Sequence, residues 1–356
     1  MSVKVPLLKL TPLTCFIRRL VTLAGTLSLT LAFFSPAACA ADILEAITVK
    51  KGSTLTLNDG DTITVTGGEN NLCAICNSIN DSTPALGKNV TIHVDGPLAG
   101  GIMLKGNNTV LNAQQLTVEI NGRYGIEVDA NNASLDLGSG SKIALTSNSM
   151  MANGIYLSHA TSLRAAALTI ITQGLGSGLY IPDTGTWADL GTNSLIQTQG
   201  EQATGIYIFG RDSGTEKAPA SLKANRLAIN TTGDYAYGIN IQPDSEVDLG
   251  QQSAIETHGE GAVCIWALGG GYVQGDNLSI TGNDGSIGVY AMTASDIDLT
   301  GKTVINMASP LETAIGTQHN EGYRASRINL SGQADIFGSL PPSQRNPRRR
   351  HRNPHR

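Results

Sequence analysis

Aromatic residues are scarce in this chain of 356 residues, where they make up 4%, and charged residues make up only 15%. Beyond residue 40 no stretch has 18 consecutive apolar residues, so no later segment is expected to cross a membrane as a helix. Sustained helical periodicity is missing too, whereas Gly, Thr, Ser and Asn are abundant. This composition is unusual for a cytosolic enzyme and favours a β-rich extracellular rod with an aliphatic core.

Cysteine is also rare, with five in the chain, two of them among the first 40 residues. Cys73 and Cys76 have the spacing of a redox pair or of half a zinc site. A second ligand pair for zinc and the βαβ context of a thioredoxin-like site are both missing. We therefore expect a local disulfide formed in an oxidising compartment. Cys264 follows Val263 in an apolar strand and is expected to be a buried small hydrophobe.

Residues 1–40 have the features of a signal peptide. Positive charges at Lys4, Lys9, Arg18 and Arg19 precede an apolar stretch over 20–34, and Ala38-Cys39-Ala40 fits a cleavage site. A short transmembrane anchor and a lipoprotein anchor on Cys39 are the alternatives. We predict that the chain is exported and that the mature protein begins at residue 41.

Charge is unevenly distributed after the signal. Residues 41–344 contain 14 Lys and Arg against 29 Asp and Glu, a net charge of −15 that disfavours nucleic acid as a partner. The last 12 residues contain six arginines. We expect residues 339–356 to be a disordered Pro/Arg-rich tail that comes from a shifted reading frame or a truncated end, with an anion-binding arm as the alternative.

A short strand pattern recurs four times at steps of 53, 59 and 51 residues. Such a repeat indicates one supersecondary unit stacked on itself, because a single unit cannot bury its apolar face. The four copies are 110–118, 163–170, 222–229 and 273–280.

A second pattern, Gly-Ile-x-Ile, recurs at steps of 24–33 residues, so each longer repeat contains two coils. Alanine replaces the glycine in Ala262-Val263-Cys264-Ile265 and in the degraded copy that begins at Ala314. The longest step suggests an insertion at 210–219. The other copies begin at Gly101, Gly125, Gly154, Gly178, Gly205, Gly238 and Gly288.

The triplet Asp-Leu-Gly, which begins at Asp136, Asp189 and Asp248, precedes strands that alternate apolar and polar residues. A coil of about 26 residues with three short strands predicts an all-β fold, a right-handed single-stranded parallel β-helix over residues 41–338.

Four tyrosines occupy one position of the Gly-Ile-x-Ile strands. Alternation along a strand places them opposite the aliphatic residues, so they form an exposed column if the aliphatic residues point inward. The column is a candidate binding surface for sugars or protein, and stacking that only stabilises adjacent coils is the alternative. These residues are Tyr156, Tyr180, Tyr207 and Tyr290.

The insertion adds Arg211 and Asp212 to the candidate surface, because insertions in solenoids are where binding usually resides. Ser213 lies in a context that resembles a nucleophilic serine, but neither His93 nor His159 has a matching motif. The recurring Asp136, Asp189 and Asp248 could support sugar cleavage, although a turn role explains their recurrence better. No catalytic residue, cofactor or metal site is predicted.

The signal, the Gly-Ile-Tyr-Ile coils, the Asp-Leu-Gly triplets and the Cys73–Cys76 pair together resemble the passenger domain of pertactin-like autotransporters. The resemblance covers most of residues 41–338. It implies export to the periplasm and transport by a C-terminal β-barrel to the cell surface. It also implies a role as an adhesin or virulence factor.

The chain departs from that family because no barrel strands follow the last coil. We therefore expect a truncated passenger that lacks its translocator and that is displayed at the outer membrane or secreted only if a translocator is supplied. Expected partners are a host-cell or matrix protein, a glycan, or a second copy. The alternatives are a β-helical polysaccharide-degrading enzyme and a non-functional gene fragment.

Overall fold

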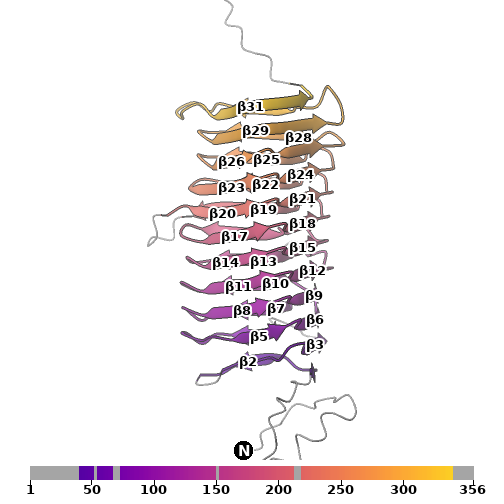
Figure 1. Cartoon of the computed structure of the whole chain (residues 1–356), viewed down its shortest axis with the longest axis vertical. Coiled ribbons are helices and arrows are strands. Elements are labelled where there is room, and N and C mark those ends of the chain that lie inside the picture. The colour runs from indigo at the N-terminus through magenta and orange to yellow at the C-terminus, as the bar shows by residue number, and fades with distance from the viewer. Residues whose placement is uncertain (1–39, 52–53, 67–72, 150–151, 212–217, 340–356) are drawn as a thin grey trace, which may run out of the picture.

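The computed structural model describes residues 40–51, 54–66, 73–149, 152–211 and 218–339. Every regular element in these ranges is a β-strand, and the strands stack into a rod (Figure 1). No described segment is a helix long and apolar enough to cross a bilayer. The signal predicted over 1–40 and the tail predicted over 339–356 lie outside the described residues, apart from Ala40 and Ser339.

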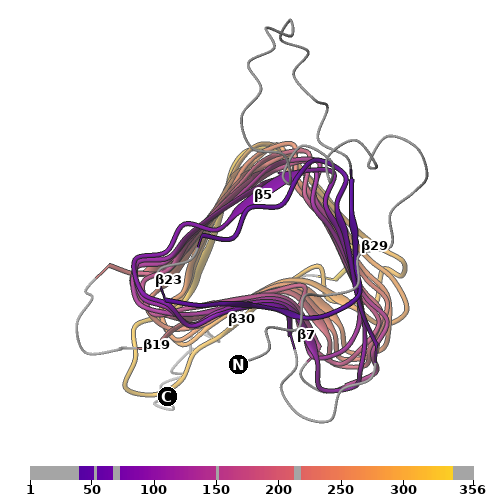
Figure 2. The same ribbon diagram turned by 90° about the horizontal axis from the view of Figure 1, so that it is seen from below.

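The rod has three faces, which give it a triangular cross-section (Figure 2). One face, here called the glycine face, is a parallel sheet of 11 strands. Its members are β2 (Ile47–Val49), β4 (Cys73–Asn77), β7 (Gly100–Leu104), β10 (Tyr124–Asp129), β13 (Asn153–Ser158), β16 (Leu179–Asp183), β19 (Thr204–Arg211), β22 (Tyr237–Ile241), β25 (Val263–Leu268), β28 (Ile287–Met292) and β30 (Ile315–Gln318).

The second face, here called the aspartate face, follows the glycine face in each coil. It consists of β5 (Ala85–Lys88), β8 (Val110–Gln114), β11 (Ser134–Ser139), β14 (Ser162–Ala166), β17 (Trp187–Thr192), β20 (Ala220–Asn225), β23 (Ser245–Gln251), β26 (Tyr272–Asp276) and the first halves of β29 (Asp296–Met307) and β31 (Arg327–Phe337).

The third face, here called the threonine face, closes the coil. It consists of β1 (Asp42–Ile43), β3 (Thr62–Thr66), β6 (Thr91–Asp95), β9 (Thr117–Asn121), β12 (Lys142–Leu145), β15 (Thr169–Thr172), β18 (Leu195–Thr198), β21 (Ala228–Thr231), β24 (Ala254–Thr257), β27 (Ser279–Gly282) and the second halves of β29 and β31. The long β29 and β31 join this face to the aspartate face in one 20-stranded sheet.

Each strand pairs in parallel with its equivalents in the coils before and after it. Viewed from the N-terminal end, the chain winds clockwise as it recedes, which makes the solenoid right-handed (Figure 2). The predicted parallel β-helix, with two coils in each fifty-residue repeat, is confirmed. The long connection predicted over 210–219 lies between β19 and β20, but Gly210 and Arg211, predicted to belong to it, are the last residues of β19.

Aliphatic side chains fill the interior in columns. Ile155, Leu179 and Ile206 are in register on neighbouring coils, and all three are fully buried. Equivalent columns run along the other two faces, and together they form one continuous core. Stacking therefore shelters apolar surface that a single coil would expose, which supplies the main driving force for the fold.

The glycines of the Gly-Ile-x-Ile pattern lie where coils approach closely. A Cβ on Gly178 would lie 2.4 Å from Cγ2 of Ile196 and 2.8 Å from the carbonyl oxygen of Gly205. The alignment that placed Ala262 in the glycine position is wrong by two residues, because Val263 pairs with Tyr237 and Ile265 with Ile239. Cys264 takes the glycine position instead. It is fully buried as predicted, and burial raises the pKa of its thiol to about 12.

The Asp-Leu-Gly triplets form the bend between the aspartate and threonine faces. In each triplet the Asp Oδ1 accepts a hydrogen bond of 2.9 Å from the backbone N–H of the glycine. The glycines adopt left-handed φ values of 56°, 52° and 54°, which glycine tolerates without strain. These bonds are Asx-turns, so a turn role accounts for the recurrence of Asp136, Asp189 and Asp248.

Candidate binding surface

The predicted tyrosine column exists on the outer side of the glycine face. Tyr156 and Tyr207 both pair in register with Tyr180. The ring centroids of Tyr156 and Tyr180 are 5.4 Å apart, and those of Tyr180 and Tyr207 are 5.1 Å apart. The first pair meets edge to face and the second is stacked, which are both favourable arrangements for aromatic rings. All three side chains are half-buried.

Sequence reasoning missed Tyr124, whose ring centroid lies 5.7 Å from that of Tyr156. Tyr124 precedes Gly125 directly, and a search of the positions before each glycine would have found it. Together with the three predicted rings it forms an aromatic row over four successive coils. We call this row the tyrosine strip: Tyr124, Tyr156, Tyr180 and Tyr207.

Tyr290 does not join the strip. Asn240 and Trp266 occupy the intervening positions of the column, since Tyr207 pairs with Asn240, Asn240 with Trp266 and Trp266 with Tyr290. Trp266 packs against Tyr237 at a centroid distance of 4.7 Å. The alignment that put Ala262 in the glycine position placed Cys264 in the aromatic column. Trp266, which occupies that column in the structure, was therefore not predicted to lie there.

Phenols are uncharged at neutral pH, and in the strip burial stabilises the neutral form further. Burial raises the pKa of Tyr180 to about 12, with the phenols of Tyr207 and Tyr156 adding to the effect. The pKa values of Tyr124, Tyr156 and Tyr207 are raised as well, chiefly by burial. The strip therefore presents ring surface with neutral hydroxyls to its surroundings.

Acidic and basic side chains alternate along the corner beside the strip. Asp183, whose side chain is 1% exposed, lies 2.8 Å from Nη2 of Arg211. Its other oxygen accepts the backbone N–H of His159 at 3.2 Å, and His159 Nε2 lies 3.1 Å from Asp129. The hydrogen bond to Asp183 raises the pKa of Arg211. Arg211 is thereby fixed at the edge of the strip, whereas Asp212 and Ser213 lie outside the described residues.

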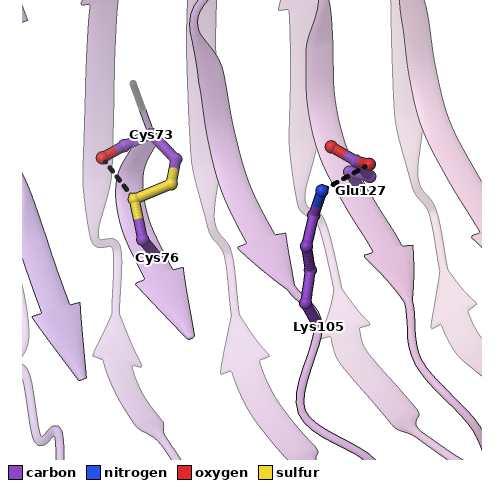
Figure 3. The surroundings of a disulfide bond; sticks show 4 residues. All are labelled: Cys73, Cys76, Lys105 and Glu127. Carbon is purple, nitrogen blue, oxygen red and sulfur yellow. Dashed lines mark hydrogen bonds and ion pairs between the residues drawn. A yellow bond between two sulfur atoms is a disulfide. The ribbon is translucent and has the colours of Figure 1, made fainter. Parts of the chain in front are cut away.

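Below the strip, the same outward column continues through Glu127, Met103 and Cys76. Cys73 and Cys76 are disulfide-bonded within β4 (Figure 3). Glu127 Oε1 lies 3.5 Å from Nζ of Lys105 on the preceding coil. Burial raises the pKa of Glu127, and Lys105 partly opposes that shift.

The acids considered for sugar cleavage lie in one column, but not on adjacent coils. Arg164 separates Asp136 from Asp189, and Lys223 separates Asp189 from Asp248. Two coil steps correspond to roughly 9.6 Å. One oxygen of each acid is already bonded to its own turn, as described above.

Comparison with known proteins identifies two relatives. The chain is 32% identical over 429 residues to the "Probable autotransporter YcgV" of Escherichia coli (strain K12), with 89% of this chain and 44% of that protein covered. It is also 32% identical over 429 residues to the "Putative uncharacterized protein YcgV" of Escherichia coli O157:H7, with 89% and 76% covered. No family model and no solved structure matches the chain.

The stacked parallel coils define a β-solenoid, a fold that fits an autotransporter passenger domain. With the identity and coverage given above, the chain belongs to the family of the autotransporter-like YcgV proteins. It spans less than half the length of the K12 relative.

Proposed function

We propose that this chain is an exported, non-catalytic passenger that acts as an adhesin. The name of the K12 relative, the solenoid fold and the predicted signal over 1–40 support export to the cell envelope or surface. Eleven parallel strands at about 4.8 Å spacing give a rod roughly 50 Å long. Such a rod holds a binding surface away from the cell that carries it.

The tyrosine strip is the observation that supports this proposal most strongly. Three half-buried rings and the buried ring of Tyr124 form a neutral aromatic row along one face, with Arg211 at its edge. Tyrosine and arginine are enriched in protein interfaces, where the ring supplies apolar contact and the hydroxyl a hydrogen bond. The partner we propose is a protein surface on a host cell or in its matrix.

The aspartates support a structural role rather than catalysis. Asp136, Asp189 and Asp248 each use Oδ1 to accept a backbone N–H that shapes the bend of the coil. This shared turn role accounts for their recurrence at the same point of alternate coils without any catalytic function. We therefore place the function of the molecule in its surface contacts.

Display on a non-adherent bacterium tests the proposal. The full chain is fused to the translocating barrel of another autotransporter, and cells that display it are compared with cells that display the barrel alone. We expect the fusion to increase adherence to epithelial cells or to immobilised matrix proteins. Equal adherence at a verified surface density would refute the adhesin role.

A further inference from the structure

The aspartate face has a hollow that the tyrosine strip does not reach. Its volume is about 400 Å³, and it lies over β17, β20, β23 and β26. Two aromatic rings and four charged side chains contribute most of its lining: Trp187, Asp189, Lys223, Glu246, Asp248 and Tyr272.

The strand register fixes the dimensions of this hollow. Trp187 pairs with Ser221, Ser221 with Glu246, and Glu246 with Tyr272. The two aromatic residues are therefore three coil steps apart, which is roughly 14 Å. Small Ser221 beside Trp187 leaves the space between the aromatic residues open. A second column, with Asp189, Lys223 and Asp248, runs along the same space.

Both rings are held in place from within the protein. The guanidinium carbon of Arg164 lies 4.9 Å from the ring centroid of Trp187, which is a cation–π contact. The hydroxyl of Tyr272 donates a 3.1 Å hydrogen bond to Gln274. Rings that are ordered before binding lose less conformational entropy when a ligand stacks on them.

The charges of the hollow disfavour an anionic ligand. Three carboxylates face one lysine, and an adjoining hollow of about 470 Å³ shares Asp248 and Tyr272 and adds Asp276 and Asp298. A polyuronate or a sulfated glycan would meet more carboxylates than cations along this path. An uncharged chain of sugars meets carboxylates that accept hydrogen bonds from its hydroxyls and a lysine that donates hydrogen bonds to them.

We propose that this hollow binds an uncharged oligosaccharide about as long as a trisaccharide, with Trp187 and Tyr272 as stacking platforms at its two ends. The face of a sugar ring is apolar and packs on aromatic rings, while its hydroxyls need the polar groups between them. The site lies on a different face from the tyrosine strip and does not depend on the adhesin proposal.

Tryptophan fluorescence offers a direct test, because the chain has only two tryptophans. Trp266→Phe leaves Trp187 as the sole tryptophan and removes an indole N–H that has no hydrogen-bond partner within the described structure. The purified full-length variant is titrated with maltotriose, cellotriose and triacetylchitotriose, and with trigalacturonate as the anionic probe. We expect a saturable change with at least one neutral trisaccharide and none with trigalacturonate.

Two further variants in the Trp266→Phe background separate binding from folding. Tyr272→Ala should weaken the binding at least about tenfold, whereas Tyr290→Ala, on the glycine face, should leave it unchanged. Circular dichroism confirms that each variant is folded. The proposal is overturned if no neutral trisaccharide binds, if trigalacturonate binds instead, or if folded Tyr272→Ala binds as tightly as its parent.

Discussion

The glycine face and the aspartate face present outward side chains on the same lattice of coils, yet with opposite results. On the glycine face, successive coils place rings side by side, so Tyr156, Tyr180 and Tyr207 cover one another and close the surface. On the aspartate face, two coils separate Trp187 from Tyr272, and the space between them stays open. The order of residue types along a column thus decides whether a solenoid face is a flat platform or a groove.

The comparison also separates two uses of aromatic residues. In the strip each ring is a neighbour of the next, so the rings stabilise the rod and form a surface together. Around the groove, Trp187 contacts Arg164 and Tyr272 contacts Gln274, so neither ring depends on the other. Substitutions on the glycine face should therefore affect stability more than equivalent ones on the aspartate face.

The largest expected effect is that of Tyr180→Ala. This change removes two ring contacts and half-buried apolar surface, which should cost about 1–3 kcal/mol. Ser221→Ala on the aspartate face is the matched control and should change stability by less than about 0.5 kcal/mol. Thermal unfolding followed by circular dichroism measures the stability of both variants. Equal Tm values would show that the strip does not stabilise the rod.

A smaller effect is expected at the bend of the aspartate face. Asp189→Ala loses the hydrogen bond to the N–H of Gly191 and should cost about 1 kcal/mol. Asp189→Asn keeps an oxygen in the same place and should retain most of the stability. If Asp189→Asn destabilises the protein as much as Asp189→Ala does, the fold requires the negative charge of Asp189 rather than its hydrogen bond to the N–H of Gly191.

The stability of the protein should fall at high pH because Tyr180 in the strip titrates there. The pKa of Tyr180 is raised from 10.0 to about 12, so between these values the unfolded chain releases this proton before the folded chain does. Stability is therefore unaffected below about pH 10 and falls as pH rises through this window.

Tyr180→Phe removes that titration. Between pH 9 and pH 11.5 its Tm should therefore fall less than the Tm of the wild type. Tyr323→Phe, at a side chain that is largely exposed, is the control and should follow the wild type. Parallel curves for wild type and Tyr180→Phe would contradict the burial of this phenol.

The smallest effect is expected at Glu127, below the strip. Burial raises its pKa above the ordinary 4.5, so the stability that this group contributes is fully present below pH 4.5 and falls as pH rises through the folded-state pKa. Glu127→Gln should therefore raise stability by about a few tenths of a kcal/mol at pH 7 and by less at pH 4. Glu119→Gln, at a side chain 43% exposed, is the control, and a fall in Tm for Glu127→Gln would show that the contact with Lys105 outweighs burial.

The local patterns of the sequence predict the fold well. Glycine occupies the position of close approach in most coils, and Asp-Leu-Gly forms the bend between the aspartate and threonine faces in three of them. Both patterns therefore recur once per coil or once per two coils, and their spacing predicts the solenoid. The sequence alignment of the coils was wrong at 262–265, because Cys264 occupies the glycine position there and the segment has no glycine to align.

The sites were less predictable, because they depend on which residues of different coils come side by side. The separation of Asp189 and Asp248 by Lys223 and the pairing of Asp183 with Arg211 follow from the register alone. The groove between Trp187 and Tyr272 joins residues 85 positions apart whose strands carry no common motif. Periodicity gives the length of a coil, but it does not show which side chains of different coils come together on the outer surface.

Adherence of displayed variants at equal surface density tests the role of the tyrosine strip most directly. The double variant Tyr156→Ser and Tyr207→Ser is compared with the wild type, with Tyr323→Phe as the displayed control. We predict that the double variant adheres no better than the barrel alone, while the control adheres like the wild type. Undiminished adherence by a folded double variant would show that the rings only hold the coils together.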